Sequence, residues 1–160
     1  MQFSAELEAK FADLVTHYPQ GRQRAALIPM LLFAQDETGA LTREVLDEIG
    51  GRLGLTRLQV EEVVSYYSML RREQAGKHHI QVCTNISCML LGAEELLDHV
   101  CERLGVKDGG TTPDGQFSVE HVECMGACSW APAVQVNYDF HHQVTSEKLD
   151  RLIDELGKVQ

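Results

Sequence analysis

The chain has 160 residues, enough for one ordinary domain or two small ones, and its hydrophobic content of 44% is typical of globular rather than disordered proteins. Its net charge of −10 divides into −3 on residues 1–76 and −7 on residues 77–160, a surface that repels nucleic acid phosphates and anionic lipid headgroups. Apolar runs fall far short of the roughly 20 residues of a membrane span, and Glu6 and Glu8 stand where a targeting sequence would carry Arg or Lys. We therefore expect a cytoplasmic protein without direct membrane insertion.

Residues 3–76 show helical periodicity throughout. A first helix is expected up to Tyr18-Pro19, and a second over about residues 24–36 with Pro29 in its first turns, where proline does not break a helix. Thr42 is expected to cap a third helix, and Thr56 and Gln59 form a capping box for a fourth. The side chains expected to face inward are Leu7, Phe11, Leu14, Val15, Tyr18, Leu27, Met30, Leu31, Ala34, Val45, Leu46, Ile49, Leu53, Val60, Val63, Val64 and Tyr67.

The third and fourth helices also imitate a helix-turn-helix across Gly54. A DNA-reading helix would carry Arg, Lys, Asn or Gln on its exposed face, whereas this one carries Glu61 and Glu62. A DNA-binding redox sensor is therefore a minor alternative, and we expect no nucleic acid partner.

The polar stretch Arg71–Gly76 is expected to be a linker, after which the periodicity changes. A strand over 79–82 leads into Cys83, and Met89, Ala93, Leu96, Leu97, Val100, Cys101 and Leu104 suggest one unbroken helix with Asn85 or Ser87 as its cap. Cys88 would then lie in the first turn, where free N–H groups and the dipole stabilise a thiolate.

Two further strands are expected, one carrying Phe117, Val119 and His121 and the other over 134–136, with a turn at 138–143 and a short strand near Val144. A last helix capped by Ser146 would bury Leu149, Leu152, Ile153 and Leu156. The order β-α-β-β-α in about 80 residues is that of a thioredoxin-like domain. We therefore expect an α+β protein, with a helical bundle over 1–76 followed by a thioredoxin-like α/β domain over 77–160.

Four cysteines in two pairs are the chemical signal of this sequence: Cys83 and Cys88, then Cys124 and Cys128. The first pair follows a strand and enters a helix, and the second lies on a strand-to-strand loop at the same expected edge of the sheet. A [2Fe–2S] cluster needs two thiolates per iron, which matches one pair for each iron. Small residues between the second pair, Gly126 and Ala127, leave room for bridging sulfides and let backbone N–H groups approach sulfur.

Other chemistries fit the spacing less well. Structural zinc usually takes a tighter Cys-x2-Cys knuckle, a thioredoxin-type redox pair needs Cys-x-x-Cys, and a Rieske centre needs two histidines. Cys101 lies on the apolar helical stripe and is expected to be a buried structural thiol. The histidine pairs 78–79 and 141–142 are expected at a strand edge and in a turn.

Both cysteine loops and the helical half resemble a known family. The residues that carry the likeness are 82–92 (VCTNISCMLLG) and 122–137 (VECMGACSWAPAVQVN), together with Tyr18-Pro19, 26–29 (ALIP), Gln35, Gly39 and Tyr66-Tyr67. They resemble the small thioredoxin-like [2Fe–2S] subunit of respiratory NADH:quinone oxidoreductase (complex I). Ile86-Ser87, where the family commonly has Thr-Pro, departs from the pattern without touching a cysteine.

The resemblance implies that Cys83, Cys88, Cys124 and Cys128 hold one [2Fe–2S] cluster that exchanges electrons with the flavin of a partner NADH-binding subunit. It implies a translocase subunit with no catalytic activity of its own, assembled with other peripheral-arm subunits at the cytoplasmic face of a bacterial inner membrane. Related subunits serve NAD-linked formate dehydrogenases and NAD-reducing hydrogenases, which are the alternative hosts. Nucleotide-binding motifs such as Gly-x-Gly-x-x-Gly are missing from the sequence, so the flavin and NADH are expected on the partner.

Overall fold

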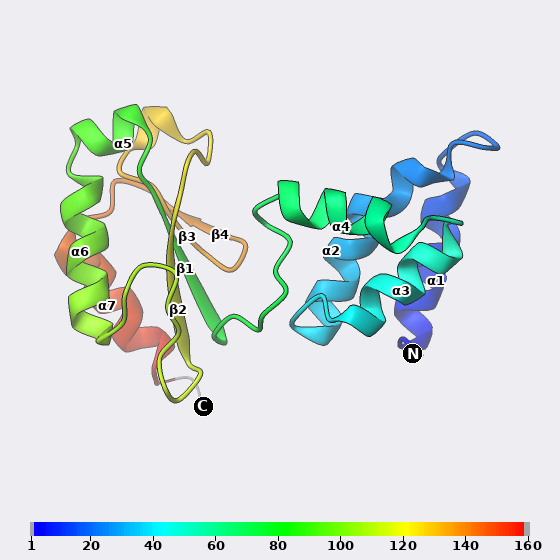
Figure 1. The fold of residues 1–160 in the computed structure, drawn as a ribbon. Helices are drawn as coiled ribbons and strands as arrows, with labels where there is room; N and C mark the ends of the chain where they lie inside the picture. Colours follow the sequence, from blue (N-terminus) through cyan, green and yellow to red (C-terminus); the bar gives the residue numbers. More distant parts are fainter. Residues whose placement is uncertain (1, 159–160) are drawn as a thin grey trace. The chain divides into compact units, whose positions relative to one another are not determined.

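The computed structural model describes residues 2–158, and the chain divides into two compact units (Figure 1), one extending to Gln74 and the other beginning at Ala75. The first is a bundle of helices and the second a four-stranded sheet packed against helices. Within residues 2–158, no helix is long and apolar enough to cross a membrane. The expected α+β class is confirmed.

Four α-helices and one 3-10 helix form the first unit. Their bounds are α1 Ala5–Thr16, η1 Gln23–Ala26, α2 Leu27–Thr38, α3 Arg43–Arg52 and α4 Arg57–Tyr66. The Thr42 side chain accepts a hydrogen bond from the N–H of Val45, and Thr56 and Gln59 form the reciprocal capping box. Both helix starts were predicted correctly because each depends on residues within one turn.

The core of the helical unit lies where the four helices meet. Its buried side chains are Phe3, Leu7, Phe11, Ala26, Leu27, Met30, Leu31, Ala34, Leu41, Val45, Leu46, Ile49, Val60, Val64 and Leu70. Leu14, Val15, Tyr18, Leu53, Val63 and Tyr67 are only partly buried around it. The 3.6-residue periodicity therefore identified the inward faces and slightly overestimated their width.

The stretch expected to be a linker is fastened at both of its ends. The Arg71 N–H donates to Gln35 Oε1 at 2.6 Å, and the Arg71 carbonyl accepts from the Leu41 N–H at 2.8 Å. The Gly76 N–H donates to Ser118 Oγ at 3.0 Å. A Cβ on Gly76 would lie 2.5 Å from the backbone carbon of Phe117, so only glycine permits this approach.

The second unit is built on a sheet with strand order β2-β1-β3-β4. Its elements are β1 His78–Cys83, α5 Ile86–Leu90, α6 Ala93–Leu104, β2 Phe117–Val122, η2 Cys128–Trp130, β3 Val134–Val136, β4 Asp139–His141 and α7 Ser146–Leu156. Strand β1 pairs with β2 in parallel and with β3 in antiparallel orientation. Helices α6 and α7 cover one face of the sheet (Figure 1), where Ile80, Val82 and Val119 are buried against Leu96 and Leu149.

Several local expectations in this unit were wrong. The apolar stripe from Met89 to Leu104 is not one helix: the chain ends α5 at Leu90, and Gly92, at φ 89°, starts α6 from a left-handed conformation. Met89 consequently lies 40% exposed instead of continuing the buried stripe. Because the chain changes direction at Gly92, the side chains before and after it no longer face the same side, and the spacing of apolar residues does not reveal this.

Smaller differences concern the last third of the chain. Thr145, not Ser146, caps α7, with its side chain accepting from the Lys148 N–H. The fourth strand spans residues 139–141 rather than lying near Val144. His121 is exposed and hydrogen-bonded to Asp108 at 2.6 Å rather than facing the core.

Candidate iron–sulfur site

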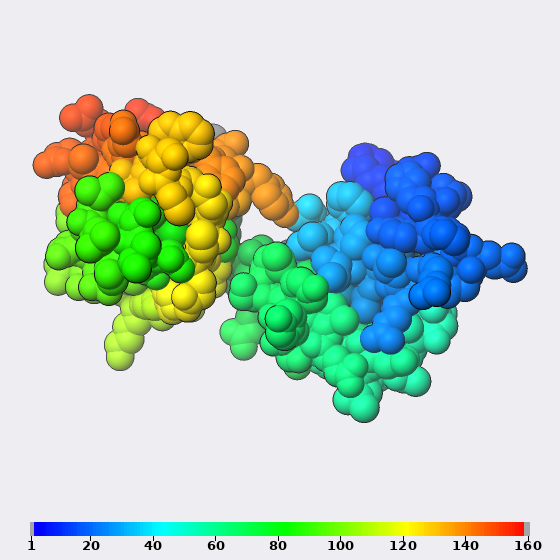
Figure 2. Space-filling view, turned by 90° about the horizontal axis from the view of Figure 1, so that it is seen from above, coloured from blue at the N-terminus to red at the C-terminus, as the bar shows by residue number. Residues whose placement is uncertain are grey.

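The two cysteine loops leave the sheet at the same edge. Cys83 ends β1 and is paired with Val122, the last residue of the parallel strand β2. The Thr84 N–H donates to the Val122 carbonyl at 3.1 Å, and the Cys83 N–H donates to the Ala133 carbonyl at 3.1 Å. Helix α5 and the segment around η2 therefore lie side by side at this end of the unit, as Figures 1 and 2 show in green and yellow-gold.

Cys88 lies in the first turn of α5, as predicted, behind the N-cap Asn85, whose Oδ1 accepts from the Ile86 N–H at 2.8 Å. The expected stabilisation of its thiolate is outweighed. Burial raises the pKa of the Cys88 thiol, and the neighbouring Cys83 and Cys128 raise it further, against a backbone hydrogen bond to Ala133 that lowers it. The Cys83 and Cys128 side chains are therefore both close enough to Cys88 to act on its charge.

The second pair is differently placed. Cys124 and Cys128 are exposed, whereas Cys83 and Cys88 are buried. The Gly126 N–H donates to Cys124 Sγ at 3.3 Å, and Gly126 adopts φ 74° to do so. Such N–H···S bonds stabilise negative charge on sulfur.

Within residues 2–158, no three His, Cys, Asp or Glu side chains gather closely enough to enclose a single metal ion. A [2Fe–2S] cluster requires a different arrangement, with two thiolates for each of two irons. The residues present fit this requirement in number and kind: four thiols in two pairs on adjacent loops, with one backbone N–H already directed at sulfur.

The loop that carries Cys128 is held from the other side by the segment after β4. The Gln143 N–H donates to the Trp130 carbonyl at 2.9 Å, and the Val144 N–H donates to the Pro132 carbonyl at 3.0 Å. The Trp130 ring stacks on His142 at 5.1 Å between centroids, yet Trp130 remains 54% exposed. Core packing does not explain this tryptophan.

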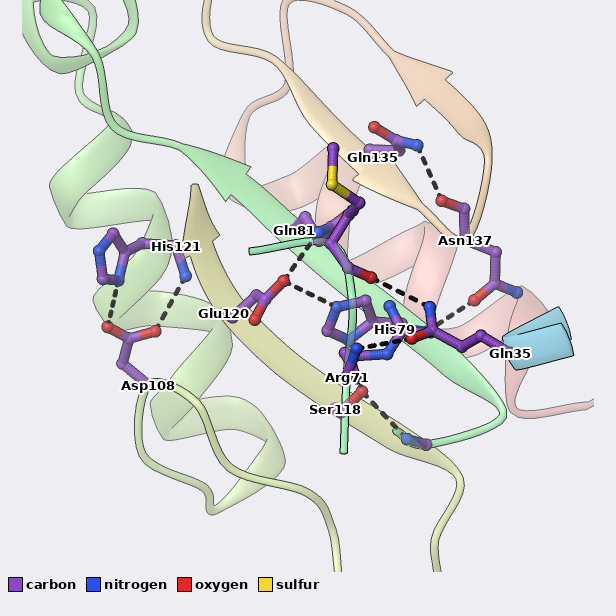
Figure 3. Close-up of polar contacts among 12 residues, drawn as sticks. Gln35, Arg71, His79, Gln81, Asp108, Ser118, Glu120, His121, Gln135 and Asn137 are labelled. Atoms are coloured by element: carbon purple, nitrogen blue, oxygen red, sulfur yellow. Dashed lines mark hydrogen bonds and ion pairs between the residues drawn. The ribbon is translucent and has the colours of Figure 1, made fainter. Parts of the chain in front are cut away.

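A polar network on the sheet was missed by the sequence interpretation. His79 was expected at a strand edge, but its strand, β1, is an interior strand of the sheet. The two ring nitrogens of His79 form hydrogen bonds with Ser118 Oγ at 2.7 Å and Glu120 Oε1 at 2.9 Å (Figure 3). Gln81 Nε2 donates to the same Glu120 oxygen at 2.7 Å. The sequence sign of this network is that polar residues alternate in both β1 and β2. It could be interpreted only after the register was known, because the register pairs His79 with Ser118 and Gln81 with Glu120.

Cys101 stands apart from the other four cysteines. It is partly buried on α6 against the core of the sheet unit, and burial raises the pKa of its thiol. This placement fits a structural thiol.

The chain is similar to known proteins over most of its length. The family described as thioredoxin-like [2Fe-2S] ferredoxin matches residues 11–157. The chain is 42% identical over 154 residues to a subunit of NADH-quinone oxidoreductase from Rhizobium meliloti, covering 96% of this chain and 88% of that protein. It is 43% identical over 148 residues to NADH-quinone oxidoreductase subunit 2 of Thermus thermophilus, covering 92% and 80% respectively.

Among solved structures, an air-oxidised NAD+-reducing [NiFe]-hydrogenase shares the fold with a TM-score of 0.73 at 20% sequence identity. The match covers 84% of this chain but only 23% of the hydrogenase chain. With a matching family description over nearly its whole length and curated relatives above 40% identity, this chain belongs to the thioredoxin-like [2Fe–2S] ferredoxin family.

Proposed function

We propose that Cys83, Cys88, Cys124 and Cys128 together hold one [2Fe–2S] cluster. The observation that carries this proposal is the parallel β1–β2 pairing, which ends at Cys83 and Val122 and sends both cysteine loops out from one edge. Cys83 and Cys88 would bind one iron, and Cys124 and Cys128 the other. When bound, the cluster supplies one-electron redox chemistry.

The chain's own residues would set the conditions for that chemistry. Burial of Cys83 and Cys88 excludes water from one side of the site, whereas Cys124 and Cys128 leave the other side open to a partner. The Gly126 N–H offsets charge on the Cys124 sulfur. Neither loop brings a charged side chain of its own between its cysteines.

We further propose that the chain is the small electron-carrying subunit of an NADH:quinone oxidoreductase. Support comes from relatives at 42% and 43% identity that are named as subunits of this enzyme, against 20% for the hydrogenase. The sequence carries no phosphate-binding glycine motif, so the flavin and NADH would belong to a partner subunit. The assembled protein would lie at the cytoplasmic face of the inner membrane with other peripheral-arm subunits.

The two parts of the chain would have different roles. Residues 77–160 would carry the cluster, and residues 1–76, whose helices hold no cysteine, would pack on a neighbouring subunit. A DNA-reading role for α3 and α4 is disfavoured because Arg57 is engaged by Asp47 at 2.5 Å and by Glu61 at 3.0 Å. The positive charge of Arg57, which would otherwise be available to a DNA phosphate, is therefore paired within the chain.

Anaerobic purification with iron, acid-labile sulfide and EPR measured together tests the cluster. We expect two irons and two sulfides per chain and a reduced-state EPR signal that is lost in Cys83→Ala and Cys124→Ala but kept in Cys101→Ala. A colourless protein, or a spectrum unchanged by Cys83→Ala, would disprove the ligand assignment. Purification with the flavin subunit, with NADH-dependent reduction of the cluster, tests the host complex.

A further inference from the structure

The four candidate ligands divide into a buried pair and an accessible pair. Cys83 and Cys88 are 4% and 2% exposed and belong to the buried core of the sheet unit. Cys124 and Cys128 are exposed, and both lie in the segment that runs from the end of β2 into η2. A thiol must be accessible before it can meet a cluster that another protein carries, so the two pairs differ in what they can contact first.

Regular secondary structure holds the buried pair in place. Cys83 is the last residue of β1, an interior strand, and its N–H donates to the Ala133 carbonyl at 3.1 Å. Cys88 lies within α5, which the Asn85 side chain caps. Exposing either sulfur therefore requires the end of the sheet or α5 to open, at a cost in packing and in hydrogen bonds.

The loop that carries Cys124 has fewer restraints. Between β2 and η2, residues 123–126 take part in no backbone–backbone hydrogen bond with any other part of residues 2–158. Within the loop, the Gly126 N–H donates to Cys124 Sγ at 3.3 Å. Segments with exposed backbone and few hydrogen bonds open at a low cost in free energy, so this loop is free to move toward an incoming partner while the buried pair stays in place.

Transfer of a cluster between proteins is an exchange of thiolate ligands. A thiol of the receiving chain binds iron as a thiolate, and the carrier thiolate that leaves takes up the released proton. The irons and sulfides pass over unchanged, and no electron is transferred. The exchange begins with the thiols that reach the carrier first, and in this chain those are Cys124 and Cys128. The Gly126 N–H also stabilises negative charge on the Cys124 sulfur.

We propose that Cys124 and Cys128 capture a [2Fe–2S] cluster from a carrier protein that holds it by thiolates, and that Cys83 and Cys88 complete the ligand set in a second step. This inference rests on the proposed function and adds the order in which the four ligands bind. The reverse order would require α5 or the end of β1 to open before any cluster is bound.

Transfer from a [2Fe–2S]-loaded glutaredoxin to the full-length, reduced, cluster-free chain under anaerobic conditions tests this order. Visible circular dichroism follows the transfer, and its first phase gives a second-order rate constant. We expect Cys124→Ala and Cys128→Ala to lower this rate constant about tenfold. Cys83→Ala and Cys88→Ala should leave it nearly unchanged but stop the transfer afterwards, so that chain and carrier stay joined in size-exclusion chromatography. The control, Cys101→Ala, should behave as wild type throughout.

Alkylation of the wild-type chain gives a second measurement that does not depend on the folding of any variant. The cluster-free chain is treated with iodoacetamide, and peptide mass spectrometry measures the rate at each cysteine, with the rates in urea as the reference for an unfolded chain. Relative to that reference, we expect Cys124 and Cys128 to react about tenfold faster than Cys83 and Cys88. Equal rates for the two pairs would overturn the proposal, because the buried pair would then be accessible in the cluster-free chain.

The outcomes separate the order of binding from the function. If Cys83→Ala slows the first phase as much as Cys124→Ala does, while wild type acquires its cluster, the order is wrong and the proposed function stands. If wild type gains a cluster from iron and sulfide but none from the carrier, capture by ligand exchange is wrong and the proposed function again stands. A chain that gains a cluster by neither route would overturn the proposed function and this inference with it.

Discussion

Cys83 and Val122 are partners at the last position of the parallel β1–β2 ladder, and the two cysteine loops diverge from this pair. A parallel pairing makes both strands end at the same edge, so the loops that carry Cys83 and Cys124, 41 positions apart in sequence, both begin there. Ligands in open α/β sheets bind beyond the carboxyl ends of parallel strands for the same reason. The position of the site is thus a consequence of strand direction.

Gly126 gives the first test of that site. Its φ of 74° and its N–H···Sγ contact with Cys124 at 3.3 Å depend on a left-handed conformation, and a Cβ there would meet no atom within 4 Å. Gly126→Ala is therefore expected to cost about 1–2 kcal/mol through the backbone alone. We expect faster cluster loss and a more negative midpoint potential, measured by absorbance decay in air and by EPR-monitored redox titration.

Gly115→Ala is the matched control for this change. Gly115 has φ 69°, is likewise free of neighbours within 4 Å of a Cβ, and lies in the loop before β2. The control should lose similar thermal stability while its cluster behaves as in wild type. An equal effect of both variants on the cluster would mean that the Gly126 N–H does not act on the sulfur.

How far the sequence predicts this fold depends on the range of each interaction. Thr42 and Thr56 were identified correctly as helix caps because each bonds an N–H three residues away. The exposure of Met89 was not predictable, because the apolar spacing continues across Gly92 while the chain turns there. The strand at 139–141 was misplaced because it depends on pairing with β3, which begins at Val134.

The candidate site shows the same division. The four cysteines and the edge on which they lie follow from spacing and strand order. The sequence does not predict which of the two cysteine pairs is buried, because the burial of Cys88 arises from packing of α5 against the core of the unit. The hydrogen bonds of His79 with Ser118 and Glu120 likewise need the register of two strands that are about 40 residues apart.

Gln35 provides a stability prediction in the helical unit. This buried amide donates to the Met69 carbonyl at 3.0 Å and accepts from the Arg71 N–H at 2.6 Å, so it fastens the end of the bundle to α2. Gln35→Leu removes both partners and leaves two backbone groups unpaired, which is expected to cost about 2–4 kcal/mol. Urea unfolding followed by circular dichroism measures the loss, and Gln20→Leu at an exposed position should leave stability nearly unchanged.

Arg52 provides a pH prediction. It contacts Glu8 at 2.6 Å and Glu48 at 2.9 Å, and the hydrogen bonds from Arg52 lower the pKa of both carboxyls. Groups with a lowered pKa stabilise the fold at pH values above the pKa of the unfolded chain, and that stability disappears as pH falls through the folded-state pKa. Stability should therefore fall on acidification below about pH 4.5.

Removing the cation should remove part of this dependence. In Arg52→Gln we expect lower stability at neutral pH and a smaller further loss between about pH 6 and about pH 3, measured as urea midpoints at each pH. Arg43→Gln, a change at an exposed arginine of the same helix, should keep the wild-type pH dependence. A wild-type dependence in Arg52→Gln would show that other carboxylates control the acid response.

The charge of the sheet unit predicts the redox behaviour of the cluster. Residues 77–160 carry a net charge of −7, and adding an electron to a cluster that is already about −2 in its oxidised form is unfavourable there. The midpoint potential should therefore lie well below about −150 mV, outside the Rieske range.

Glu123 is exposed and adjacent to Cys124 in the sequence, so its negative charge acts on the cluster from nearby. Glu123→Gln should raise the midpoint potential by about 20 mV through loss of one screened charge. Glu155→Gln makes the same charge change near the end of α7 and should shift the potential much less in the same EPR-monitored titration. A potential that follows total charge, with equal shifts in both variants, would instead indicate that the local field at Cys124 has no special influence.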